Sequence, residues 1–182
     1  MILLSETPIL DIRASYQAFD LKPLSPSAVP RALKKAQRYR LLNEPGAAES
    51  ICLDVLQVDP DNQQALVTLL LAMTDRLAKG YSIGDTQIQE VLGRLSGEYE
   101  RVYYTGIVWE RRAKARLAKG SPGANYAAYD WFREAMEWFE KAEAVRPSGN
   151  DDAILRWNSC ARVIMSNNLS ARSEEYAEQF LE

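Results

Sequence analysis

Carboxylates, basic groups and hydroxyls are the reactive side chains of this 182-residue chain, which contains no histidine. Histidine-ligated zinc, imidazole general bases and histidine-activated nucleophiles are therefore excluded. The most regular carboxylates are Asp130, Glu134 and Glu137, which recur every three or four residues. Such a row could supply a carboxylate pair for acid–base chemistry or metal binding. Because no D-x-D-x-D-G calcium loop is present, a solvated helix face explains it better.

Two glycine-rich turns, at 80–84 and 120–123, lack the GxxxxGK[ST] and GxGxxG patterns that cradle phosphates. The two cysteines, Cys52 and Cys160, lie far apart within apolar helical patterns, which predicts reduced core thiols. We therefore expect a protein that is not an enzyme, with no catalytic residues, no metal and no cofactor.

The composition is that of a folded globular protein, with 47% hydrophobic and 26% charged residues. The 22 basic and 25 acidic residues give a net charge of −3, which argues against a general nucleic-acid binder. The first residues lack the basic region of a signal peptide, and no stretch approaches the length of about 18 uncharged apolar residues that suggests a membrane span. The sequence therefore predicts a cytoplasmic protein that does not enter a membrane.

Apolar residues recur at helical spacing along almost the whole chain, and no alternating strand pattern exceeds a few residues. Prolines and glycines divide this pattern into separate helices. The predicted helices cover 8–19, 31–42, a segment that stops at 59–62, 63–79, 85–96, 98–119, 126–145, 151–165 and a short piece at 173–181. The chain is thus predicted to be all-α, with about eight helices paired into antiparallel hairpins.

A pattern of small, aromatic and proline positions marks the 34-residue hairpin from Val29 to Asn62. Its members are Ala36, Tyr39, Ala48, Cys52, Val55 and Pro60. The two helices must approach closely at Ala36 and Ala48, and Pro60 ends the second helix. In these positions the hairpin resembles a tetratricopeptide repeat (TPR).

A second copy of the pattern follows later in the chain, at Gly106, Trp109, Ala135, Phe139, Ala142 and Pro147. Its two small positions are 29 residues apart against 12 in the first copy, so about 17 residues are inserted. Residues 63–96 fill one repeat length between the copies, but Leu70, Ser82 and Arg94 occupy the small and proline positions. The middle copy is therefore degenerate.

The resemblance implies a right-handed α-α superhelix, whose first helices line a concave groove that binds peptides or proteins without catalysis. It divides the chain into an N-terminal helix and proline-rich linker (1–28), a TPR-like domain (29–165) and a C-terminal tail or short helix (166–182). The helix from 151 is expected to cap the array. The predicted function is that of an adapter or scaffold that holds a protein segment in this groove.

The first helices of the two clear copies hold 11 of the 22 basic residues. If they face the groove, they would attract an acidic peptide. The residues we select as partner-binding are Lys34, Arg38, Arg111, Arg112 and Arg116, with Tyr104, Tyr126 and Tyr129 as exposed aromatic contacts. A solvated outer face, matched within the hairpin by the acidic row of helix 126–145, is the alternative explanation of the basic residues.

Some members of the family clamp a terminal carboxylate with lysine, asparagine and arginine. The corresponding positions here hold Leu33, Gln37, Gln64 and Thr68, which argues against that clamp.

Two other functions stay open. The chain could self-associate through the apolar helix 63–79, whose exposed face would comprise Ala65, Leu66, Leu69, Leu70 and Met73. It could also bind RNA or another polyanion through the basic first helices, which a steep loss of binding with salt would reveal.

Overall fold

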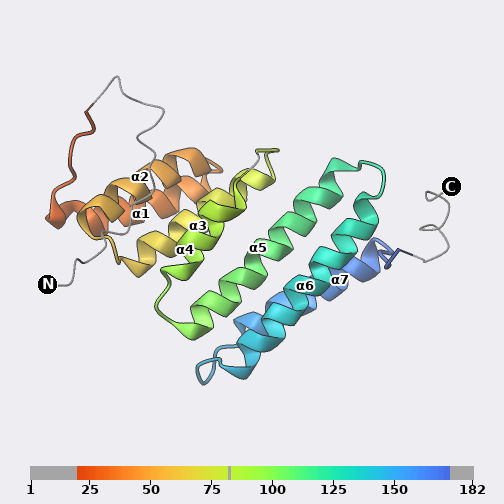
Figure 1. Ribbon diagram of the computed structural model, residues 1–182. Helices are drawn as coiled ribbons and strands as arrows, with labels where there is room; N and C mark the ends of the chain where they lie inside the picture. Colours follow the sequence, from red (N-terminus) through yellow and green to blue (C-terminus); the bar gives the residue numbers. More distant parts are fainter. Residues whose placement is uncertain (1–19, 82, 173–182) are drawn as a thin grey trace, which may run out of the picture.

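A computed structural model describes residues 20–81 and 83–172, which form seven α-helices and a short 3-10 turn and contain no β-strand (Figure 1). The predicted all-α class is confirmed. The helices are α1 (Val29–Leu41), α2 (Pro45–Val58), α3 (Gln63–Leu77), α4 (Asp85–Gly93), α5 (Glu98–Lys119), α6 (Ala124–Ala144) and α7 (Asp152–Ser166). The helices predicted over 8–19 and 173–181 lie outside the described residues.

Short turns pair α1 with α2, α3 with α4 and α5 with α6, and α7 packs back against α6 (Figure 1). The first helices of successive pairs are also neighbours, since α1 contacts α3 and α3 contacts α5. The helices within each pair must run antiparallel because the turns between them are short. No helix within the described residues is long and apolar enough to cross a membrane.

The predicted helix boundaries hold to within a few residues, and local chemistry explains the differences. Helix α1 begins at Val29, two residues early, because Pro30 is favourable in a first turn. Helix α4 ends at Gly93 and not at 96. The carbonyl oxygens of Leu95 and Ser96 accept hydrogen bonds from the Arg101 guanidinium, at 2.7 and 2.8 Å, and so need no helical partner.

The N-terminal region has an aliphatic core. Helices α1 to α4 contribute mostly leucine, valine, isoleucine and alanine to it, and Val108 of α5 completes it. Fully or almost fully buried members include Ala36, Ala48, Val55, Leu66, Leu69, Leu70, Ile88 and Val91. This burial confirms the prediction that Ala36 and Ala48 lie inside the first hairpin.

The C-terminal region, made of α5, α6 and α7, has a core that includes large aromatic side chains. Phe132 and Phe139 are the largest fully buried residues, and Met136 and Ile107 pack with them. A Cβ atom on Gly106 would stand 2.6 Å from Cε1 of Phe139, so only glycine allows α5 to approach α6 this closely. Gly106, a small position of the second copy of the pattern, is thus a point of close approach.

Candidate protein-binding surface

A carboxylate held by two arginines joins three of the first helices. Asp75 of α3 accepts a hydrogen bond from Nε of Arg40 in α1 at 2.8 Å through one oxygen. Its other oxygen is paired with Nη1 of Arg111 in α5, also at 2.8 Å. All three side chains are between one fifth and about one quarter exposed. Charge-assisted hydrogen bonds of this kind are about twice as strong as neutral ones.

The guanidinium of Arg111 is held further by α3. It donates to the carbonyl oxygen of Leu71 at 2.7 Å and to the hydroxyl of Thr74. Burial lowers the pKa of Arg111 from its usual value, while the neighbouring Asp75 raises it. Because a guanidinium is not deprotonated in proteins, Arg111 keeps its charge in this site.

A second carboxylate, Glu110 of α5, is only 1% exposed. Its Oε1 accepts a hydrogen bond from Lys114 one turn later and lies 3.6 Å from Nη1 of Arg156 in α7. Its Oε2 is buried and has no hydrogen-bond partner within the described part of the chain. Burying a carboxylate oxygen without a partner destabilises the fold, so this atom marks an incomplete polar site.

These charged residues form two clusters, and no ion pair among the described residues joins them. Asp75 with Arg40 and Arg111 connects α1, α3 and α5, and Glu110 with Lys114 and Arg156 connects α5 and α7. We call the two clusters together the first-helix network, which consists of Arg40, Asp75, Glu110, Arg111, Lys114 and Arg156. Four cations and two anions give it a formal excess of two positive charges (4 − 2). Lys114 and Arg156 are the most accessible members, with side chains 45% and 44% exposed. The network therefore presents positive charge to solvent.

Tyrosines of α5 line the same part of the helix. Tyr99 stacks on Tyr103 with ring centroids 5.5 Å apart, and Tyr103 meets Tyr104 edge to face at 5.2 Å. Tyr104 packs against both cores. Burial raises the pKa of Tyr104, so its hydroxyl stays protonated and can donate a hydrogen bond.

Of the eight residues selected from sequence, only Arg111 belongs to the first-helix network, and Tyr104 lies seven residues before it on the same side of α5. Lys34 and Arg38 are exposed on α1. Arg112 is adjacent to Arg111 and therefore points about 100° away from it around the helix. It pairs instead with Asp85 of α4 and lies over the Trp109 ring, 5.2 Å from its centroid.

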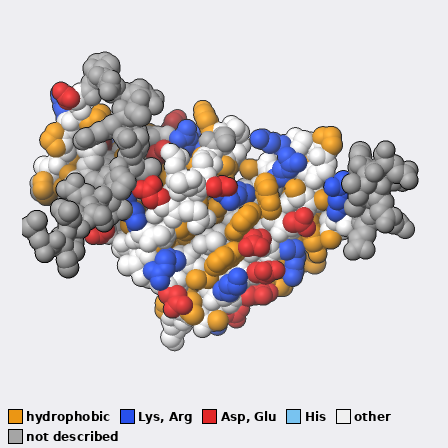
Figure 2. All heavy atoms as spheres, viewed as in Figure 1, with side chains coloured by type: hydrophobic (Ala, Val, Ile, Leu, Met, Phe, Trp, Pro, Cys, Tyr) orange, Lys and Arg blue, Asp and Glu red, His pale blue; other side chains and the backbone are white. Residues whose placement is uncertain are grey.

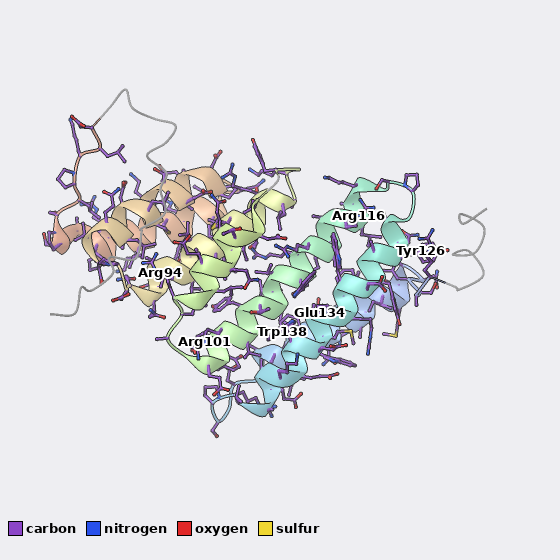
Figure 3. The ribbon with its side chains drawn as sticks, viewed as in Figure 1. Arg94, Arg101, Arg116, Tyr126, Glu134 and Trp138 are labelled. Atoms are coloured by element: carbon purple, nitrogen blue, oxygen red, sulfur yellow. The ribbon has the colours of Figure 1, made fainter. Side chains whose placement is uncertain are left out.

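The other three selected residues lie elsewhere in the C-terminal region. Arg116 is half-buried near the end of α5, and Figure 3 shows it on the face that carries Arg101. Tyr126 lines a shallow pocket beside the 120–123 turn, together with Asn168 of the segment after α7. Tyr129 is half-buried against the aromatic core. The eight residues therefore do not form one continuous surface.

Five members of the network, Arg40, Asp75, Glu110, Lys114 and Arg156, were not selected from sequence. Glu110 had a visible signal, because it lies four residues after Gly106 and three before Ala113 on a stripe predicted to be buried. The others had none, since an isolated charge on an amphipathic helix is ordinary.

Two further expectations concern the packing of α5 on α6 and the surroundings of α3. No ion pair among the described residues joins α5 to α6, so the acidic row of α6 is not matched within its own hairpin. Also, α3 packs against α1, α2, α4 and α5. All five apolar residues offered for self-association, Ala65, Leu66, Leu69, Leu70 and Met73, are consequently buried.

No protein-family model matches the chain, and no curated protein or solved structure matches it either. The resemblance to TPR proteins rests on the residue pattern alone.

Proposed function

We propose that the protein is a non-enzymatic adapter or scaffold that holds an acidic peptide or protein segment against its first helices. In this proposal residues 29–165 form a TPR-like domain whose helix pairs stack as a right-handed superhelix. A cytoplasmic location belongs to the same proposal and is supported by the unpaired, buried thiols of Cys52 and Cys160.

The first-helix network is the observation that carries the proposal. Apolar side chains could join these helices without the desolvation cost of charges, so a network that is positive and incompletely satisfied is costly for a purely structural joint. A carboxylate of the partner, bound over Lys114 and Arg156, would pair with the exposed positive charges of the network. Such charge-assisted contacts also increase the rate of association with an acidic partner.

Site-specific photo-cross-linking tests the proposal. A photoreactive amino acid replaces Gln64, which is exposed on α3 seven residues before Leu71 and hence on the same side of that helix. The matched control carries the same group at Gln89, which is exposed on α4, the second helix of its pair. Extract from the cells that contain the protein is irradiated with each variant at low and moderate salt.

We expect the Gln64 variant to capture a protein whose cross-linked segment is net acidic, with a yield that falls as salt rises. A synthetic peptide of that segment should bind, and its Glu→Gln counterpart should bind more weakly. Equal capture from both positions, or a captured segment without acidic residues, would contradict the proposal.

A further inference from the structure

A stripe of three tryptophans lies on the face of α5 and α6 that is turned away from the first-helix network. Trp109 and Trp131 are in tilted contact with ring centroids 6.3 Å apart, and Trp138 lies two turns after Trp131 on the same helix. Trp109 is two residues from Arg111, which places the two side chains about 200° apart around α5. We call Trp109, Trp131 and Trp138 the tryptophan stripe.

All three tryptophans are half-buried and so remain partly accessible. Trp138 is outside the aromatic core cluster, its indole N–H donates to Glu134 at 2.9 Å, and the Lys141 ammonium lies 4.2 Å from its ring centroid. Figure 3 shows Trp138 and Glu134 on this face, and Figure 2 shows a band of hydrophobic side chains crossing it. Tryptophan is enriched among the residues that dominate binding energy at interfaces.

Opposite charges flank the stripe. The α5 side carries Arg101, Arg112 and Arg116, and the α6 side carries Asp130, Glu134 and Glu137. Figure 2 shows basic side chains on one edge of the hydrophobic band, and on the other edge a run of acidic side chains with basic ones among them. Arg112 is paired with Asp85 of α4, but no ion pair joins α5 to α6 among the described residues, so the two rows do not neutralise each other.

The symmetry of the two charged rows determines which partner can bind to this face. A two-fold axis along the stripe places α5 of one copy over α6 of another, so each basic row faces an acidic row. An axis across the stripe would place like charges together. The surface is therefore complementary to itself in one orientation, as an isologous interface must be.

We infer that a second copy of this chain docks here, with the two tryptophan stripes packed together and each α5 antiparallel to α6 of the other copy. A uniformly acidic or basic partner would be repelled by one of the two rows, whereas a second copy satisfies both. Helices of 22 and 21 residues are about 32 Å long, so a two-helix face covers roughly 600 to 700 Å² per copy. That area is somewhat below the usual size for a stable complex and indicates a reversible dimer in the micromolar range. This inference does not depend on the proposed function, because it uses the opposite face.

A charge swap tests the inference by sedimentation velocity of the full chain across the micromolar range. One variant carries Arg112→Glu and Arg116→Glu, and the other carries Asp130→Lys and Glu134→Lys. We expect each variant alone to dimerise roughly tenfold more weakly or worse, because the substituted residues then face a row of like charge across the interface. Mixing the two variants should restore the dimer, since every pair is then attractive again.

The matched control is Lys34→Glu with Arg38→Glu, which makes the same charge change on exposed residues of α1. It should leave the dimer unchanged. Circular dichroism checks that each variant keeps its helical content. Because Arg112 also pairs with Asp85, Arg116→Glu alone replaces the first variant if that one loses helical content.

Trp138→Ala removes part of the stripe and should weaken the dimer without unfolding the chain, as Trp138 is outside the core cluster. A wild-type chain that stays monomeric throughout the range would overturn the inference. So would a dimer that survives both charge variants, or a mixture of the two variants that does not reassociate.

Discussion

The first hairpin (α1 and α2) and the third (α5 and α6) share one order of small and aromatic positions but differ in length and core. Helices of 13 and 14 residues enclose an aliphatic core in the first, and helices of 22 and 21 residues enclose buried phenylalanines in the third. Alanine is small enough where α1 meets α2. The third hairpin needs Gly106 because the Phe139 ring fills the space that a side chain would occupy.

This comparison separates two roles of the repeat pattern. The small positions set how closely a pair of helices packs, whether the core is aliphatic or aromatic. The added length of α5 and α6 supplies Trp131 of the tryptophan stripe, whereas Trp109 occupies the aromatic repeat position and Trp138 lies between the repeat positions Ala135 and Phe139. The stripe therefore combines residues of the repeat pattern with one from the added turns.

The largest effect should come from Phe132→Ala, which we expect to lower the free energy of unfolding by about 3 to 5 kcal/mol because it leaves a cavity in the aromatic core. Urea denaturation measures it. The control is Leu155→Ala, because the Leu155 side chain is exposed on α7. It should change stability by less than about 0.5 kcal/mol.

The two cysteines report on each region separately, since Cys52 lies in the aliphatic core and Cys160 in the aromatic one. In Phe132→Ala we expect Cys160 to react with iodoacetamide at lower urea concentration than Cys52. Simultaneous reaction of both thiols would mean that the two regions unfold as one unit. They would then have no separate stabilities to compare.

Asp75→Ala should lower the free energy of unfolding by about 1 to 3 kcal/mol, because Arg40 and Arg111 lose their shared partner at the junction between the regions. Thermal and urea denaturation measure the loss. The control is Asp61→Ala, an exposed aspartate next to α3. A loss no larger than that of the control would show that the junction does not depend on the ion pairs.

Gly106→Ala should destabilise the protein by about 1 to 3 kcal/mol, because the new methyl group overlaps the buried Phe139 ring. Gly93→Ala is the matched control. Its Cβ would meet no atom within 4 Å, and alanine is the better helix former, so we expect stability to stay the same or rise by about 0.5 to 1 kcal/mol. Equal effects at both glycines would contradict the conclusion that the third hairpin requires glycine where α5 meets α6.

The last effect is absent at neutral pH and concerns alkaline solution. Burial raises the pKa of Cys52 and of Cys160 from 9.0 to about 12, and that of Tyr99 from 10.0 to about 12. The unfolded chain therefore loses these protons at lower pH than the folded chain does. Stability should be unaffected at neutral pH and should fall as pH rises from 9 to 12.

Cys52→Ala and Cys160→Ala should each reduce this loss of stability at alkaline pH. The first substitution tests the aliphatic core and the second tests the aromatic core. Urea denaturation over that pH interval checks the expectation. A decline that neither substitution changes would assign the alkaline loss to other groups.

Helix positions and core positions were largely predictable from sequence. Periodicity located all seven described helices, and the repeat pattern identified Ala36, Ala48 and Gly106 as small positions of the hairpins, because both signals depend on spacing within a helix or a hairpin. Helix ends were less predictable. The end of α4 depends on the Arg101 side chain, which comes from the next helix.

The candidate surface was predictable only in part. Tyr104 and Arg111 were selected, but adjacent Arg112 was selected with them although it faces another helix. A basic residue carries the same sequence signal on either side of a helix. The distinction requires knowing which helices flank α5.

The sequence by itself therefore determined the all-α class, the helical segments and the small positions at which helix pairs close, because these follow from chain-local geometry and the burial of apolar stripes. Only the tertiary structure decided which charges meet. Asp75 lies 35 residues from Arg40, and Glu110 lies on a different helix from Arg156. Their contacts depend on how α1, α3, α5 and α7 lie beside one another, and no spacing along a single helix encodes that.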